Sequence, residues 1–480
     1  MGLQKNFIYS SILTVSKYLF PLIVYPYVSR TLGLSNIGIV NFIDNLVNYF
    51  VLISMMGITT VGIREIAAAR DEKKRLSKTF ISLLTLTAIT TVIAIAVLWL
   101  AMYTVPKLTP YRDLLYVGLI KLVFNLFIME WFFMGIEDFK YITNRSIFVK
   151  CLYVAAIFLF VKTASDYKIY YMISAATVIV NALINLMYVR KFVHFSIRDI
   201  DIRPFYQAFL IMGVYVLLTN VYMMLNPVWL GFVTDTDEVG YFTTATKLHN
   251  IIMAVLLSFA NILFPRVSYL LAEGKKKEFW KKINIAFDAI FLFAFPTIVF
   301  IMAVGPELLH FIVGNGFEGS YLPLRIITPL VLIIGIEQIL VIQILMAMRQ
   351  DNTVFRNSII GAVTALLLNI LLTSHLGAVG SAIVWVNAEC IIMFASMYAI
   401  FKKYQYTMPY KRVLSYTISY LPLLFLSLLF RHYIDKEILL LCVVAAFTII
   451  YAGIIELFVL KNIVVRQSIM PAIKSIFNLR

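Results

Sequence analysis

The amino-acid sequence predicts an all-α polytopic membrane protein with about 14 transmembrane helices, arranged as two pseudo-symmetric six-helix lobes plus two C-terminal helices. Of the 480 residues, 61% are hydrophobic and only 14% are charged, and the mean hydropathy is +0.90. A soluble chain of this length does not need so many apolar residues. The apolar runs are about 20 residues long, which is the length of a helix that crosses roughly 30 Å of hydrocarbon. They lack the alternation of barrel strands.

Fourteen apolar segments are predicted to cross the membrane. The first follows Lys5 without a small-residue cleavage site, so it is interpreted as a transmembrane helix and not as a cleaved signal peptide. Prolines inside the first and seventh segments predict kinks. In chain order the segments are 7–29, 37–61, 80–104, 114–135, 146–162, 169–189, 206–230, 240–264, 283–304, 322–347, 357–374, 379–401, 413–430 and 438–460.

The basic residues predict the orientation of these segments. A net charge of +16 would suggest a nucleic-acid partner in a soluble protein, but in membrane proteins lysine and arginine accumulate in cytoplasmic loops. If the N-terminus is inside, the cytoplasmic segments contain 29 Lys and Arg residues and the external loops contain 7. We therefore expect both termini in the cytoplasm and no nucleic-acid partner.

Cysteines and histidines show no pattern typical of a metal site or a catalytic site. Cys151, Cys390 and Cys442 each lie inside an apolar segment, and none forms a CxxC pair. We interpret them as small buried hydrophobic residues. The five histidines are scattered without metal-ligand spacing, and no nucleophile motif is present. The sequence thus predicts no metal, no cofactor and no enzymatic activity.

Two parts of the chain resemble each other. Residues 37–78 align with 239–282 without a gap over the first 30 positions, and both copies end in a loop with six Lys and Arg residues. Because six spans per copy preserve orientation, this predicts a parallel repeat about an axis along the membrane normal. The predicted domains are an N-terminal lobe (1–195), a C-terminal lobe (196–401) and a last part with two helices and a cytoplasmic tail (402–480).

Several cations lie inside the apolar segments, where topology does not explain them. Lys17, Lys121 and Lys247 stand about seven or more residues from a segment end. A charge at that depth costs several kcal/mol unless it faces protein or a water-filled cavity, which favours a cavity role for Lys17 and Lys247. Lys150 and Arg325 lie nearer to segment ends and can reach the interface by snorkelling.

Polar side chains follow one face of several predicted helices, for example at i, i+3, i+4 and i+7 in the second segment. In a two-lobed transporter the substrate lies between the halves, lined by equivalent helices. These polar residues are therefore candidates for lining the cavity or for coupling transport to an ion. The alternative is that they only hydrogen-bond one helix to another. The candidates are Asn41, Asp44, Asn45, Asn48, Thr243, Asn250 and Glu337.

Three charged residues lie at the predicted inner ends of the second and eighth segments, namely Arg64, Glu65 and Arg266. Arg64 and Arg266 occupy matching positions in the two copies of the repeat. Ordinary positive-inside charge and a local ion pair are one interpretation. The other is an electropositive cytoplasmic mouth that gathers anionic lipid headgroups.

Motifs near the N-terminus resemble a known family. They are PYVSRTLG (26–33), Gly38, NYF (48–50), MGITTVGIREIAAARD (56–71) and MGIEDF (134–139). Together they resemble bacterial O-antigen and polysaccharide flippases of the Wzx type. These form the polysaccharide transport family of the multidrug/oligosaccharidyl-lipid/polysaccharide exporter superfamily. The resemblance covers the whole chain by span count, but it is specific only in these motifs.

The resemblance implies a flippase in the bacterial inner membrane. Such a protein moves undecaprenyl-diphosphate-linked oligosaccharide from the cytoplasmic to the periplasmic leaflet by alternating access, driven by an ion gradient of H+ or Na+. It implies contact with membrane lipids and with other proteins of polysaccharide assembly. It also implies a cationic substrate cavity, for which Lys17, Lys121 and Lys247 fit by position and Arg325 fits less well. Lysine and arginine are natural partners of a diphosphate in a low-dielectric cavity.

Three other functions stay open at this point. A drug or small-molecule cation antiporter of the same superfamily usually has twelve spans, and its cavity would not be mainly cationic. A flippase for the peptidoglycan lipid precursor also has fourteen spans. A membrane polymerase or ligase would need a large periplasmic loop with active-site residues, whereas the longest external loop here, about 305–321, holds no convincing acid–base pair.

Overall fold

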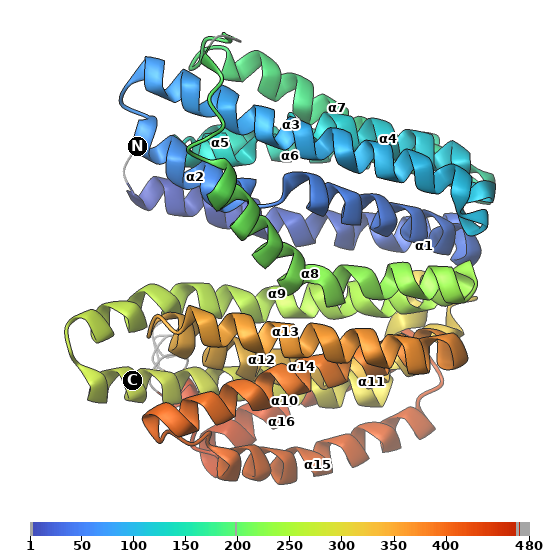
Figure 1. Ribbon diagram of the computed structural model, residues 1–480. Coiled ribbons are helices and arrows are strands. Elements are labelled where there is room, and N and C mark those ends of the chain that lie inside the picture. Colours follow the sequence, from blue (N-terminus) through green and yellow to red (C-terminus); the bar gives the residue numbers. More distant parts are fainter. Residues whose placement is uncertain (1–2, 197–198, 467–469, 471–480) are drawn as a thin grey trace. The chain divides into compact units, whose positions relative to one another are not determined.

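The computed structural model describes residues 3–196, 199–466 and 470. In its helices the side chains of 3–8, 10, 11, 18, 215, 218–223, 255, 257–266 and 272 are outside this description. The chain divides into two compact units, unit 1 (Met1–Gly240) and unit 2 (Tyr241–Arg480), which are considered separately. Within the described ranges the regular structure is helical and contains no strand, which confirms the predicted all-α class (Figure 1).

The described part of unit 1 contains the helices α1 to α8 and the 3-10 segments η1 and η2. Its first helix is interrupted at Gly33, whose φ of 75° and ψ of 171° are accessible to glycine but not to other residues, so α1 is two helices in succession. Helical backbone continues through both prolines of this segment. The elements are α1 (Leu3–Met55), α2 (Ile58–Ala69), α3 (Lys73–Thr104), η1 (Pro106–Tyr111), α4 (Arg112–Asn125), α5 (Glu130–Gly135), α6 (Phe139–Phe160), η2 (Ala164–Asp166), α7 (Tyr167–Val189) and α8 (Tyr206–Val233).

Unit 2 follows through α9, which begins at the end of unit 1. Three of its segments are π-helical, a rare geometry that is frequent at functional sites. The elements are α9 (Thr236–Ala272), α10 (Lys276–Val313), η4 (Glu318–Ser320), α11 (Tyr321–Ile327), α12 (Leu330–Gln338), η5 (Ile339–Met346), α13 (Asp351–Leu368), η6 (Asn369–Thr373), α14 (Ser374–Tyr404), α15 (Tyr410–Tyr433), α16 (Glu437–Ile454) and η7 (Ile455–Val459).

Each predicted span falls on helical segments, although several are subdivided. The span 37–61 ends early at Met55, because the chain turns at Gly57, where a side chain would lie 2.5 Å from the Phe209 carbonyl oxygen of α8. Among the described residues, length and composition identify 10 candidate membrane spans, of which Ile12–Ala69 and Asp351–Tyr404 each contain two predicted spans. The number of 14 membrane crossings therefore stays a prediction.

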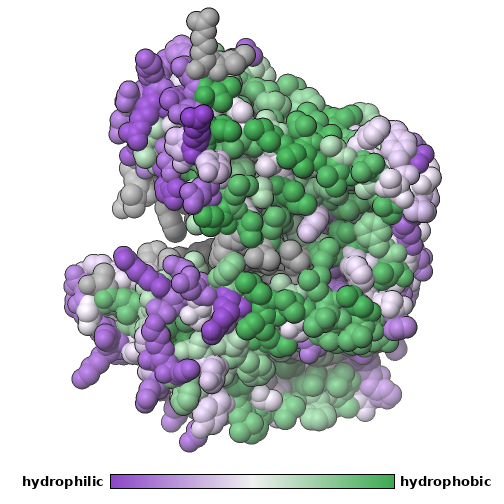
Figure 2. Space-filling view, in the orientation of Figure 1, coloured by the Kyte–Doolittle hydropathy of each residue, from purple (hydrophilic) through white to green (hydrophobic). Residues whose placement is uncertain are grey.

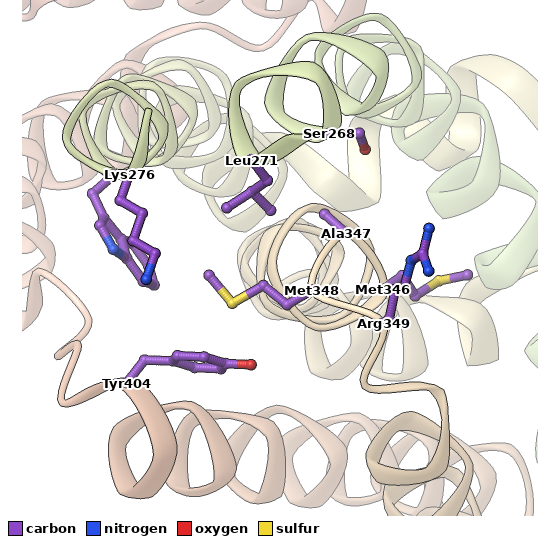
Figure 3. Close-up of a pocket in the computed structure, with 9 residues that line it drawn as sticks. Ser268, Leu271, Lys276, Met346, Ala347, Met348, Arg349 and Tyr404 are labelled. Atoms are coloured by element: carbon purple, nitrogen blue, oxygen red, sulfur yellow. The ribbon is translucent and has the colours of Figure 1, made fainter. Parts of the chain in front are cut away.

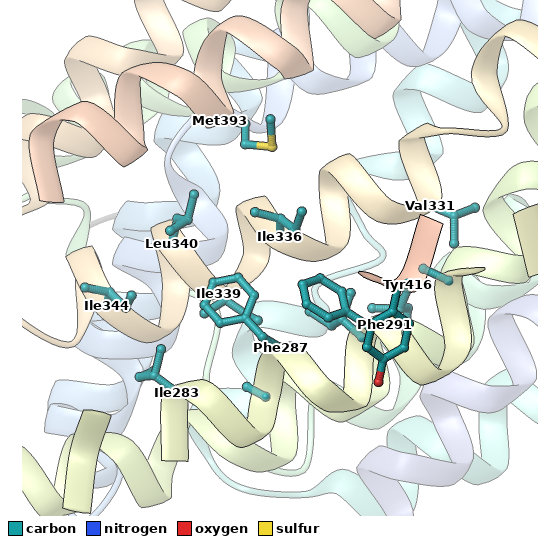
Figure 4. Close-up of a cluster of buried hydrophobic side chains, with 14 of the residues drawn as sticks. Ile283, Phe287, Phe291, Val331, Ile336, Ile339, Leu340, Ile344, Met393 and Tyr416 are labelled. Carbon is teal, nitrogen blue, oxygen red and sulfur yellow. The ribbon is translucent and has the colours of Figure 1, made fainter. Parts of the chain in front are cut away.

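Each unit has its own hydrophobic core. In unit 1 the fully buried aromatic residues Phe80, Phe132 and Phe133 join α3 to α5. In unit 2 the side chains of Phe287 and Phe291 on α10 pack against α12 and η5 (Figure 4). The division of the chain at Gly240 differs from the boundary at 195/196 that the internal repeat suggests, and the repeat-based domains stay a prediction.

Large hydrophobic side chains are exposed on the outside of each unit, as membrane-spanning helices require. Leu159 is 67% exposed and Ile449 is 73% exposed. In each unit taken by itself, the visible surface is hydrophobic along the helices and hydrophilic at their ends (Figure 2). The prediction that all three cysteines are buried is wrong, because Cys151 and Cys442 are exposed on such outer faces.

We expect the α1–α8 contact in unit 1 to depend on a glycine. A Cβ atom on Gly231 would lie 2.1 Å from the ring of Phe42, so Gly231→Val should overpack the contact and destabilise the protein by about 1–3 kcal/mol. The measurement is the melting temperature of purified protein in detergent. Gly453→Ala on α16, where a Cβ meets nothing within 4 Å, is the matched control. Equal melting temperatures for the two variants would contradict the expectation.

Candidate functional site

A charged cluster in unit 1 joins two helices that are distant in sequence. The Lys121 ammonium on α4 donates to Asp44 Oδ1 on α1 at 2.5 Å and to Asn48 Oδ1 at 3.2 Å. Asn48 Nδ2 donates to Asp44 Oδ2 at 3.0 Å, which closes the triangle. Asp44 and Asn48 share a face because they are four residues apart on one helix. Two of the predicted polar residues and one predicted cation thus meet.

A glycine on α4 permits this contact. Gly118 lies one helical turn before Lys121, and a Cβ there would stand 2.5 Å from Val47 of α1 and 3.2 Å from the Tyr171 hydroxyl. The two helices can therefore approach closely at this level. Lys121 is 8% exposed, and a buried ammonium needs a counter-charge. Asp44 supplies it, so Lys121 is already neutralised within its own unit.

Asn41 and Asn45 share the polar face of α1 with Asp44 and Asn48. Asn45 Nδ2 donates to the backbone carbonyl of Asn41 at 2.7 Å, which is a bond inside α1. Both side chains are half-buried. The stripe therefore divides into Asp44 and Asn48, which serve the ion pair, and Asn45, which bonds its own helix.

Tyrosines near Asp44 form a group that the sequence analysis did not single out. Tyr153 of α6 and Tyr170 of α7 interact electrostatically, and both lie in the field of Asp44 together with Tyr171. Their signal in the sequence is the tyrosine-rich start of α7, YKIYY (167–171). Hydroxyl groups at this place can bind either sugars or ions.

Lys17 lies near a second lysine that the sequence analysis assigned to the interface. Lys17 is exposed on α1, and its charge acts repulsively on Lys150 of α6. Lys150 is half-buried, donates to Ser16 Oγ at 2.8 Å and lies 5.7 Å from the centre of the Phe20 ring. The two ammonium groups therefore repel each other across α1 and α6, and we call Lys17 and Lys150 the cationic pair; Glu130 attracts Lys150 more weakly than Lys17 repels it. The bond to Ser16 directs Lys150 towards α1.

A buried arginine near the start of α6 holds another polar network. Arg145 is 5% exposed and contacts Glu130 of α5 at 2.8 Å and Asn185 of α7 at 2.5 Å. Asn185 also accepts a hydrogen bond from the Tyr141 hydroxyl at 2.8 Å. The sequence analysis placed Arg145 in a loop. Because its charge is paired and enclosed, we interpret it as structural.

The candidates in unit 2 differ in their exposure. Thr243 is 4% exposed, Lys247 is half-buried and Asn250 is exposed, although all three belong to α9. Arg325 of α11 is half-buried, and its Nε has no hydrogen-bond partner among the described residues. Lys17 and Lys121 lie in the other unit, so one cavity lined by all four cations stays a prediction.

Glu337 has a carboxyl partner that the sequence analysis did not pair with it. Its side chain on α12 lies in the electrostatic field of Glu389 of α14, which is 3% exposed. Glu389 Oε1 accepts a hydrogen bond from Trp385 Nε1 at 3.0 Å, and the ring of His249 lies edge-on to Trp385 at 5.2 Å. Two buried carboxyl groups this close repel each other when both are charged.

The predicted mouth residues are described only in part. Arg64 and its neighbour Glu65 form an exposed ion pair at 2.8 Å. The side chain of Arg266 is outside the described residues. Near the same end of α9, unit 2 has a pocket of about 810 Å³ with Lys276 and Arg349 in its wall. The Met348 side chain points into the space between Lys276 and Tyr404 (Figure 3).

The motifs that carry the family resemblance meet in unit 1. On α2 and α5, a Cβ at Gly62 would lie 2.5 Å from Trp131, and one at Gly135 would lie 2.6 Å from Ile66. Close packing of the two short helices therefore requires both glycines. Beyond them Arg70 Nη1 contacts Glu137 at 2.7 Å, and this bond raises the pKa of the Arg70 guanidinium.

These features define a multi-pass membrane protein with a transporter fold, and its described residues contain no group of side chains that could hold a metal ion. The family model described as polysaccharide biosynthesis protein matches residues 3–271, so the chain belongs to that family. It is similar to the "Putative O-antigen transporter" of Escherichia coli (strain K12), with 25% identity over 82% of this chain and 95% of the relative. A protein of the same name from Shigella dysenteriae is 24% identical over 83% of this chain and 100% of the relative.

Solved structures share the fold at low sequence identity. The lipid II flippase MurJ in an inward closed conformation has a TM-score of 0.77 and 14% identity, over 94% of this chain and 99% of that chain. An inward-facing multidrug resistance MATE family transporter of the MOP superfamily has a TM-score of 0.62 and 14% identity, over 80% of this chain and 96% of that chain. The family and these neighbours are transporters and flippases and not enzymes.

We expect that substitutions at Asp44 and Lys121 change the stability of the protein in a non-additive way, so that the second substitution restores stability lost through the first. Lys121→Met leaves the Asp44 carboxylate without its counter-charge, whereas adding Asp44→Asn restores a neutral pair. The single variant should lose somewhat less than the ~3–5 kcal/mol of a fully buried pair, because Asp44 is 31% exposed. The double variant should recover most of this loss. The measurement is the melting temperature in detergent.

The matched control for this pair is Asn45→Leu, which removes a bond within one helix and should change the melting temperature little. If the double variant were less stable than Lys121→Met, the two groups would not compensate each other and the ion-pair assignment would be wrong.

Proposed function

We propose that this protein is a flippase for a lipid-linked surface glycan in the bacterial inner membrane. Its substrate is an undecaprenyl-diphosphate-linked oligosaccharide, an O-antigen or another polysaccharide repeat unit, which it moves from the cytoplasmic to the periplasmic leaflet by alternating access. The observation that carries the proposal is the cationic pair Lys17–Lys150 inside the spans of a chain from the polysaccharide biosynthesis protein family.

The diphosphate is the part of the substrate that these lysines would recognise. Two ammonium groups that repel each other gain when an anion is placed between them, and a diphosphate carries about two negative charges. Lys17 is exposed and therefore accessible to such a ligand. Lys121, by contrast, is occupied by Asp44 and is a less suitable partner. Lys247 and Arg325 supply cations in unit 2.

The carboxyl groups inside the spans support coupling to an ion gradient. Glu337 and Glu389 repel each other when both are charged, and a bound H+ or Na+ would compensate this repulsion. Asp44 is the corresponding candidate in unit 1, where Lys121 is the competing cation. A carboxylate that exchanges its counter-ion during the cycle is a physical means of coupling.

The topology follows from the distribution of charge. We propose that both termini are cytoplasmic, that residues 1–195 and 196–401 form the two lobes, and that residues 402–480 add two helices and a cytoplasmic tail. The basic pocket with Lys276 and Arg349 then lies on the cytoplasmic side, where the substrate is made. Other proteins of polysaccharide assembly are expected as partners on both sides of the membrane.

We expect Lys17→Ala/Lys150→Ala to abolish glycan export while the protein remains in the membrane. The reason is that the pair loses both charges that face the diphosphate, whereas Lys17→Arg/Lys150→Arg keeps them and should retain much of the export. The measurement is a surface-glycan stain combined with extraction of lipid-linked repeat units. Lys73→Ala/Lys74→Ala, at the exposed start of α3, is the control with the same change in charge. Full export by the double alanine variant would overturn the assignment.

Deletion of the gene separates the flippase from its competitors. The proposal predicts viable cells that lack the surface glycan and accumulate lipid-linked repeat units on the cytoplasmic side. Lethality with an accumulated peptidoglycan precursor would instead indicate the peptidoglycan lipid flippase. Normal surface glycan with altered sensitivity to cationic drugs would indicate the antiporter.

A further inference from the structure

A pocket in unit 2 lies far along the chain from the candidate substrate residues. It has a volume of about 530 Å³ and is formed by α10, by the first turns of α15 and by the segment that follows η7. Its polar wall contains Asp288, Arg412, Ser415, Lys461 and Asn462. Neither the family resemblance nor the proposed transport uses these residues.

The floor of the pocket is rigid and its polar groups are satisfied. Asn462 is 2% exposed, and its Nδ2 donates to the Asp288 carbonyl at 2.9 Å and to the Tyr416 hydroxyl at 2.8 Å. Asn462 Oδ1 accepts from the backbone of Val464 at 2.8 Å. Tyr416 donates in turn to Glu456, which is fully buried. The chain around Lys461 is therefore held in place by buried hydrogen bonds.

Two cations stand at the rim above this floor. Arg412 Nη1 contacts Asp288 Oδ1 at 2.9 Å, yet the arginine side chain is 43% exposed. Because a guanidinium has five N–H donors, further donors can reach a second oxygen ligand. Lys461 is exposed and has a left-handed φ of 53°, which is uncommon for lysine. Asp288 is the one acid among the described wall residues, and Arg412 compensates it, so no acid of the wall is left to compensate Lys461.

Apolar side chains that face away from the protein complete the pocket. Ile418 is 58% exposed and Val459 is 59% exposed, and both line it. A cationic rim beside exposed apolar residues fits a phosphate group whose hydrocarbon tails run along the outside of the helices. The positive-inside pattern puts this end of α15 and η7 at the cytoplasmic leaflet, where anionic lipids create a negative surface potential.

We propose that this pocket binds the phosphate headgroup of an anionic membrane phospholipid, and that the bound lipid fastens α15 and η7 to α10. Arg412 and Lys461 contact the phosphate oxygens, and Ile418 and Val459 contact the start of the acyl chains. The Ser415 hydroxyl donates to the Lys411 carbonyl at 2.9 Å and can accept from a headgroup hydroxyl. This lipid is a resident ligand and not the transported substrate. The site is therefore independent of the proposed function.

The test is native mass spectrometry of the full-length protein in detergent, titrated with phosphatidylglycerol. Lys461→Ala leaves the Arg412–Asp288 pair intact and should reduce the affinity for the lipid about fivefold, the effect of losing roughly 1 kcal/mol from one cation near a lipid surface. Arg412→Gln/Asp288→Asn should reduce it while keeping a neutral hydrogen-bonded pair in place. Lys411→Ala, an exposed neighbour outside the pocket wall, is the matched control and should bind as the unmodified protein does.

Two further arms identify the ligand. Phosphatidylcholine should bind more weakly than phosphatidylglycerol, and millimolar inorganic phosphate should not displace the bound lipid, because phosphate lacks the acyl chains. Displacement by inorganic phosphate would replace the lipid site with a site for a free anion. Equal lipid binding by Lys461→Ala and Lys411→Ala would overturn the proposal. Because the readout is lipid binding without substrate, a failure here leaves the export experiments unaffected.

Discussion

A charged side chain inside a membrane-spanning bundle has to find its counter-charge within the bundle, and this requirement organises both units. Lys121 meets Asp44, Arg145 meets Glu130, and Arg412 meets Asp288. Each pair joins separate helices, so each fixes a helix contact as well as a charge. Small residues allow the approach, as Gly118 does beside Lys121. The helix packing and the placement of charge therefore depend on the same contacts.

Cations inside the bundle that have no acidic partner in an ion pair are the candidates for binding an anionic substrate. Lys121 has the depth expected of a cavity residue, but its partner is already present. Lys17 and Lys150 instead repel each other when both are charged, and an anionic ligand between them would compensate this repulsion. The diphosphate that we propose as their ligand would match this charge in a chain from a polysaccharide biosynthesis family. Lys121 is therefore interpreted as structural, whereas Lys17 and Lys150 are proposed to bind an anionic ligand.

Hydropathy and charge predict the helical class, the positions of the spans and the face shared by Asp44 and Asn48, because these are local properties of the chain. The pairing of Lys121 with Asp44 is not local, since the two residues are 77 positions apart. Lys150 was assigned to the interface because its span was expected to begin at 146. The helix in fact begins at Phe139, which sets Lys150 and Arg145 inside the bundle. The cysteines were expected to be buried by a rule for soluble proteins, which fails where lipid covers the outer surface.

The exposed cysteines have a practical consequence. Cys151 belongs to unit 1 and Cys442 to unit 2, so the natural sequence carries one accessible thiol on the outer face of each unit. Once the half-buried Cys390 is replaced, a pair of spin labels or fluorophores on the two thiols would report the separation of the units in a lipid bilayer. Spectroscopy on that pair can follow a rocking motion during turnover without altering any residue of the ion pairs or of the cationic pair.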